Sequence, residues 1–114
     1  MNENPSVVAN TVALQRRLLN SKRCLVILTA AWCGHCKSMA PEIEKVKEYI
    51  TKHTNGVDCE HIDESTVDRK LLAGYKITGF PTILLISEGR MLSQFNGERS
   101  ASSIINYAIA SAIF

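Results

Sequence analysis

The feature that most constrains the fold of this chain is a change of pattern around two cysteines, Cys33 and Cys36. Before them, residues 24–30 form a continuous apolar run rich in branched side chains, which predicts a strand buried on both faces. After them, apolar residues recur at three- and four-residue steps up to residue 50, which predicts an amphipathic helix. The two cysteines therefore lie at a strand-to-helix junction.

The other segments alternate in type along the chain. Residues 6–9 fit either a short first strand or the entry to a helix, and a helix with Asn10 or Thr11 as its N-cap runs to about Leu19. The later elements that we expect are a strand at 57–62, a helix at 66–73, a strand at 82–86, its hairpin partner at 91–95 and a last helix capped by Ser100 or Ser102. This order predicts an α/β domain with a central mixed sheet of four to five strands, flanked by helices on both faces.

Composition indicates one globular domain and argues against several classes of function. The chain has 114 residues, 46% of them hydrophobic and 21% charged, so we expect a single soluble domain over residues 1–114. A formal net charge of +2 is too small to indicate a nucleic-acid or membrane surface. The sequence contains no secretory or retention signal and no membrane span, so the cytoplasm is the default location, with the compartment left open. We expect a monomer.

The spacing of the two cysteines predicts redox chemistry. Cys33 lies at a helix N-terminus, where free backbone N–H groups and the helix dipole stabilise a thiolate. Cys36 follows three residues later on the same helix face, within reach of a bond to Cys33. The first thiolate can attack a substrate disulfide, and the second can resolve the mixed disulfide. His35, between them, can carry a positive charge that favours the Cys33 thiolate.

A structural or metal-binding role for the pair is the alternative. Zinc takes four ligands, usually as two pairs, and this sequence has no second CxxC motif. We therefore expect no metal and no organic cofactor. Cys24 and Cys59 belong to no motif and fall in strands that we expect to be internal, so we interpret them as packing residues too far offset for a mutual disulfide.

Three segments resemble one family in the order that the family has them. Residues 32–42, from Trp32 to Glu42, resemble the catalytic segment of protein disulfide isomerase domains, which belong to the thioredoxin superfamily. Residues 75–82 are similar to the family's second signature, and residues 95–99 to its loop before the last helix. The resemblance covers nearly the whole chain and implies a thioredoxin fold.

The resemblance also implies roles for particular residues. It implies a cis peptide bond between Phe80 and Pro81, in a loop that packs against the cysteine pair and holds substrate backbone. Arg99 occupies the place of an arginine that tunes the resolving cysteine. We expect Cys33, Cys36, His35 and Arg99 to carry the chemistry. We expect the substrate to contact Trp32, Gly34, Phe80, Pro81, Thr82 and Gly97, although Thr82 also reads as an ordinary strand residue.

The sequence departs from the family at one buried position. The family keeps an acid six residues before the first cysteine as a proton acceptor for the resolving cysteine, and here that residue is Ile27. The lysine that faces this acid in the family is replaced by Cys59 or His61, depending on a one-residue gap. Our hypothesis is that proton transfer at Cys36 is slower or that neutral His61 substitutes as the relay.

The predicted function is therefore exchange of protein disulfides through Cys33 and Cys36, of the protein disulfide isomerase type. The expected partners are cysteine-containing proteins, with glutathione or a thiol reductase or oxidase as the redox partner. Two alternatives stay open: a thioredoxin-type disulfide reductase, and a peptide-binding or chaperone module whose cysteines are incidental.

Overall fold

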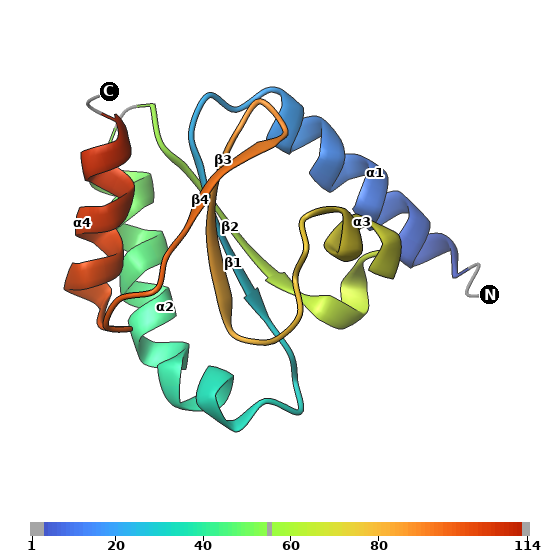
Figure 1. Cartoon of the computed structure of the whole chain (residues 1–114), viewed down its shortest axis with the longest axis horizontal. Helices are drawn as coiled ribbons and strands as arrows, with labels where there is room; N and C mark the ends of the chain where they lie inside the picture. The colour runs from blue at the N-terminus through green and yellow to red at the C-terminus, as the bar shows by residue number, and fades with distance from the viewer. Residues whose placement is uncertain (1–3, 55, 113–114) are drawn as a thin grey trace.

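The computed structural model describes residues 4–54 and 56–112, so residues 1–3, 55 and 113–114 of the expected domain lie outside the described part (Figure 1). Its elements are α1 (Pro5–Leu19), β1 (Cys24–Thr29), α2 (Gly34–His53), β2 (Asp58–Asp63), the 3-10 turn η1 (Glu64–Thr66), α3 (Arg69–Gly74), β3 (Thr82–Ser87), β4 (Arg90–Gln94) and α4 (Ala101–Ala112). Within the described ranges, no helix is both long and apolar enough to cross a membrane.

The four strands form one mixed sheet in the order β2-β1-β3-β4. β1 pairs with β2 in parallel, as the alternating pattern predicts, and the β3–β4 hairpin is antiparallel. The pair β1–β3 is antiparallel as well. The reason is that α3 has only six residues, about 9 Å of helix, which is too short to return the chain along a strand of about 20 Å. β3 therefore starts at the end of the sheet where β2 stops, with Thr82 opposite Leu28.

Helices cover both faces of the sheet, and each face has its own core (Figure 1). On one face, Leu25 and Ile27 of β1 pack with the apolar stripe of α2 and with Ile104 and Ala108 of α4. On the other face, Val26 and Leu28 pack with α1 and α3. All six residues of β1 are buried, because this central strand has a helix layer on each side.

Two local expectations were wrong at helix starts. Residues 6–9 are helical, and the N-cap of α1 is Asn4, whose side chain accepts the Ser6 N–H at 2.8 Å with Pro5 at the first helical position. Neither Asn10 nor Thr11 caps this helix. The predicted helix at 66–73 is also broken, because Val67 is extended and Asp68 caps a shorter α3.

Candidate functional site

The two cysteines of the motif lie at the start of α2, at the end of the sheet where β1 stops. Cys33 is the N-cap residue, and its sulfur accepts the Cys36 N–H at 3.2 Å. The Cys33 thiol also donates to the Phe80 carbonyl at 3.5 Å. Both cysteines are nearly covered, Cys33 being 6% and Cys36 5% exposed.

The pKa values of the two thiols move in opposite directions. The pKa of Cys33 is lowered, chiefly because the Cys36 thiol donates to it, with help from the backbone N–H groups of Cys36 and His35 and from the positive charge of Arg99. The pKa of Cys36 is raised, first by burial and then by the hydrogen bond between its thiol and the Cys33 sulfur. The Cys33 sulfur therefore ionises more easily than the Cys36 sulfur. This difference suits Cys33 to act as the nucleophile and Cys36 as the resolving cysteine.

The loop before β3 closes one side of the pair. The Phe80–Pro81 peptide bond is cis. The Phe80 ring packs against Ala30, Cys33 and Cys36. Thr82 is buried at the first position of β3. Its hydroxyl donates to the Gly79 carbonyl at 2.6 Å and so stabilises this loop. The antiparallel return of β3 beside β1 brings residues 79–82 next to the cysteines.

Trp32 forms the exposed border of the site. Its side chain is 71% exposed, and its ring stands edge-on to Phe80 with the centroids 5.9 Å apart. The indole N–H donates to the Glu64 carboxylate at 3.2 Å. Glu64 was not among the predicted site residues. It follows β2 directly, and β1 and β2 are parallel strands that end side by side, so the residues after both strands meet at one edge of the sheet. This parallel pairing is the sequence signal that would have placed Glu64 near Trp32.

The remaining predicted residues differ in how they approach the pair. His35 acts on Cys33 through its backbone N–H, while its side chain is exposed. Gly34 begins α2 and is exposed. Gly97 lies against the Phe95 ring, where an added Cβ would come within 2.9 Å of two ring carbons. Arg99 is exposed, and its charge lowers the pKa of both thiols. Substrate contact by the six residues named for it stays a prediction: Trp32, Gly34, Phe80, Pro81, Thr82 and Gly97.

The position of the missing acid is apolar. Ile27 is fully buried in the core beneath α2, and the residue opposite it in β2 is His61, not Cys59. His61 Nε2 lies 3.0 Å from the Thr29 hydroxyl. His61 is an exposed residue, and partial removal of its ring from water is the main cause that lowers its pKa. Proton relay by His61 stays a hypothesis, because the groups that shift the pKa of Cys36 are its own burial, Cys33, Ala30 and Arg99.

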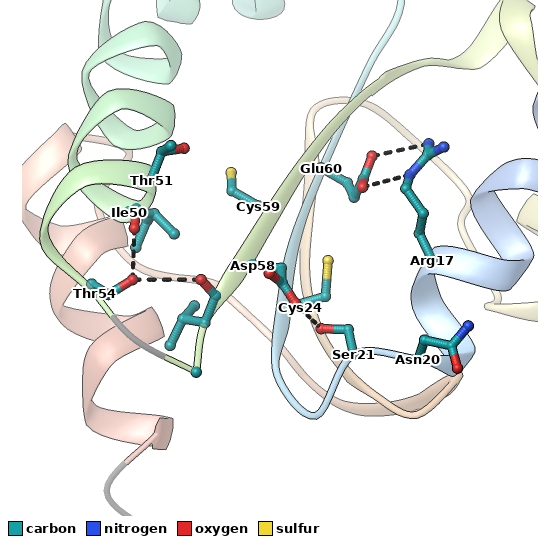
Figure 2. A pocket seen from close by; sticks show the side chains of 12 residues that line it. Arg17, Asn20, Ser21, Cys24, Ile50, Thr51, Thr54, Asp58, Cys59 and Glu60 are labelled. Atoms are coloured by element: carbon teal, nitrogen blue, oxygen red, sulfur yellow. Dashed lines mark hydrogen bonds and ion pairs between the residues drawn. The ribbon is translucent and has the colours of Figure 1, made fainter.

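Cys24 and Cys59 lie at the opposite end of the sheet and on opposite sides of it. Figure 2 shows them on opposite sides of β2, because Cys24 stands beside Asp58 and Cys59 beside Leu25 in the strand register, and neighbouring residues of a strand face opposite sides of the sheet. Both are free thiols, and burial raises the pKa of each, to about 11 for Cys59. These features agree with packing residues. β2 is an edge strand rather than an internal one, so Cys59 is only half-buried.

An open pocket of about 590 Å³ surrounds this part of β2. Its charged side chains have partners: Arg17 holds Glu60 at 2.7 Å, and Asp58 accepts from Ser21 at 2.6 Å (Figure 2). In the part of the chain that the structure describes, no three His, Cys, Asp or Glu side chains are grouped as a metal site would require.

The fold, the thiol pair and the adjoining proline loop define a class of protein, and comparison with known families agrees: residues 6–110 match the thioredoxin family model, so the chain belongs to the thioredoxin family. The chain is 40% identical over 85 residues to a protein disulfide-isomerase of Triticum aestivum, and 38% identical over 88 residues to a probable protein disulfide-isomerase A4 of Caenorhabditis elegans. These matches cover 73% and 77% of this chain but only 16% and 14% of the relatives.

Solved structures give the same fold. The first two thioredoxin domains of Eps1p from Naumovozyma dairenensis match with a TM-score of 0.81 at 23% identity, over 90% of this chain and 39% of that one. The first thioredoxin domain of mouse protein disulfide-isomerase A4 matches with a TM-score of 0.77 at 24% identity, over 87% of this chain and 69% of that one.

Proposed function

We propose that this domain is a thiol–disulfide oxidoreductase of the protein disulfide isomerase type, acting on cysteine-containing proteins. The observation that carries the proposal is the thiol pair at the start of α2: the Cys33 sulfur, at the N-cap, accepts the Cys36 N–H at 3.2 Å, and the pKa of Cys33 is lowered while that of Cys36 is raised. The relatives named protein disulfide-isomerase, which match this chain over most of its length, support the same reaction class.

The exchange would run in two steps. The Cys33 thiolate attacks one sulfur of a substrate disulfide, so the substrate S–S bond breaks, a mixed disulfide forms, and the other substrate sulfur leaves as a thiolate that takes up a proton. Cys36 then loses its proton and attacks the Cys33 sulfur, which releases the second substrate thiol. Two electrons pass from the domain to the substrate, and the reverse sequence oxidises a dithiol. Trp32 and Phe80 offer apolar surface to a peptide beside Cys33.

The direction of exchange is a matter of reduction potential, which equilibration of the Cys33/Cys36 couple with glutathione measures. A potential near about −180 mV supports an isomerase or oxidase, whereas one near about −270 mV assigns the domain to thioredoxin-type disulfide reduction. A variant that carries both Cys33→Ser and Cys36→Ser provides the control. If this variant retains the activity of the wild type towards disulfide-containing proteins, the thiols are incidental and the redox proposal is wrong.

A further inference from the structure

Glu42 connects two elements around the thiol pair, α2 and the start of α4. One oxygen of its carboxylate accepts the Ala101 N–H at 3.0 Å, and the other accepts from Lys45 Nζ at 3.0 Å. The Glu42 side chain is 31% exposed, so these bonds are partly shielded from water. Its pKa is lowered, chiefly by the Ala101 N–H and then by Lys45, so the carboxylate is ionised at neutral pH.

The bond from Ala101 is a helix cap supplied by another element. The first N–H groups of a helix have no partner within the helix, and negative charge there interacts favourably with the helix dipole. In α4 the Ser100 hydroxyl accepts the Ser103 N–H at 3.3 Å, as a residue in the N-cap position does. The Ala101 N–H instead goes to Glu42, which lies 59 positions earlier in the chain. This contact thus sets where the chain enters α4 relative to α2.

Arg99 lies in the segment that this contact holds. The segment leaves the sheet where the Phe95 N–H donates to the Ile83 carbonyl at 2.9 Å, and it reaches α4 at Ala101. Arg99 is two residues before Ala101. If the hydrogen bond between Ala101 and Glu42 is lost and Ala101 moves, the backbone of Arg99 moves with it. Its charge favours the thiolate forms of Cys33 and Cys36.

We propose that Glu42 is a positioning residue for the thiol chemistry: by accepting the Ala101 N–H, its carboxylate holds the segment that carries Arg99 against α2, the helix whose N-cap is Cys33 and whose first turn contains Cys36. The proposal deepens the proposed function and rests on it for its biological meaning. The quantity that it concerns, the acidity of Cys33, can nevertheless be measured without any disulfide substrate.

The sign of the effect separates positioning from a direct effect of charge. A negative charge acting directly on a thiol disfavours the thiolate, so its removal would lower the pKa of Cys33. If Glu42 acts by holding Arg99 in place, its removal weakens the favourable positive field and raises that pKa. The rise is limited to the contribution of Arg99, which the rise in Arg99→Ala measures directly; for opposite charges within about a Debye length of each other in water it is of the order of a few tenths.

The test is the pH dependence of Cys33 alkylation by iodoacetamide in the wild type and in Glu42→Ala, Glu42→Gln, Arg99→Ala and the double variant Glu42→Ala/Arg99→Ala. We expect Glu42→Ala to raise the pKa of Cys33 and Glu42→Gln to raise it less than half as much, because the amide oxygen still accepts the N–H. We expect no further rise from Glu42→Ala once Arg99 is removed. Hydrogen exchange at the Ala101 amide is expected to quicken in Glu42→Ala.

Glu48→Ala is the matched control, because Glu48 is an exposed glutamate of the same helix that pairs with Lys52 at 3.0 Å. It is expected to leave the pKa of Cys33 unchanged. The proposal is overturned if Glu42→Ala leaves this pKa unchanged or lowers it, or if the same rise persists without Arg99. A wild type with no disulfide-exchange activity refutes the proposed function alone, because the alkylation profile still reports whether Glu42 acts through Arg99.

Discussion

Replacement of Ile27 by aspartate tests whether the core beneath the thiol pair is dry. Ile27 is fully buried and packs with Met39, Ile43 and Val46 on the face that α2 covers. A carboxyl placed there is removed from water without a partner, which raises its pKa above the value of about 3.9 that it has in the unfolded chain. Because the folded state then binds the proton more tightly, the variant must lose stability as the pH rises.

The magnitude follows from the size of the pKa shift. A rise of about 3 in the pKa of the carboxyl costs about 1.5 kcal/mol at pH 5 and about 4 kcal/mol at pH 8. Loss of the buried Ile27 side chain adds about 2–5 kcal/mol at any pH. The chain of 114 residues has a total stability of about 6–17 kcal/mol, so Ile27→Asp is expected to be folded at pH 5 and close to unfolding at pH 8.

Ile27→Asn is the matched control, because asparagine has nearly the same shape as aspartate and does not titrate. Urea unfolding of both variants at pH 5 and pH 8 isolates the charge from the lost packing. We expect the gap between them to widen by about 2.5 kcal/mol over this range. Equal stability at pH 8 would mean that the carboxylate has reached water or a hydrogen-bond partner such as His61, and our description of the Ile27 position as apolar core would be refuted.

Three further predictions concern His61 and Glu64, which lie around the site. If His61 relays the Cys36 proton, His61→Phe slows resolution of the mixed disulfide by about tenfold or more, and unchanged exchange rates between pH 6 and 8 would rule the relay out. The lowered pKa of His61 also means that stability is lost as the pH falls below the unfolded value of 6.5, and His61→Phe is expected to reduce this loss in urea unfolding at pH 7 and pH 5. Glu64→Ala removes a hydrogen bond worth about 0.5–1.5 kcal/mol, so we expect more acrylamide quenching of Trp32, the single tryptophan. Glu64→Gln is the control, because it keeps an acceptor for the indole N–H and is expected to show quenching close to that of the wild type. Equal quenching in the wild type and Glu64→Ala would show that this hydrogen bond does not hold the indole.

Much of the site could be predicted because its residues are neighbours in the chain. Cys33 and Cys36 are three positions apart at the start of a helix, so the bond between the Cys36 N–H and the Cys33 sulfur follows from local geometry. The strand before them was also predictable, since a buried central strand has no exposed face to interrupt its apolar run. The start of α1 was missed because the cap at Asn4 precedes a stretch of branched residues that also suits a strand.

Contacts between distant segments could not be predicted from the pattern of residues. Glu64 bonds to Trp32 across 32 positions, and Glu42 bonds to Ala101 across 59. Each is an ordinary charged residue in the sequence, and its role depends on which segment packs beside it.

The pattern of residues along the chain was thus enough to predict the order of most elements, the two helix layers and the position of the thiol pair at a helix start. Those properties depend on side-chain period, caps and spacing, which are local along the chain. Three features became known only from the folded arrangement: β3 runs antiparallel to β1, His61 rather than Cys59 stands beside Ile27, and Cys24 and Cys59 lie on opposite faces of the sheet. These facts depend on strand register, where a shift of one residue turns every side chain to the other face.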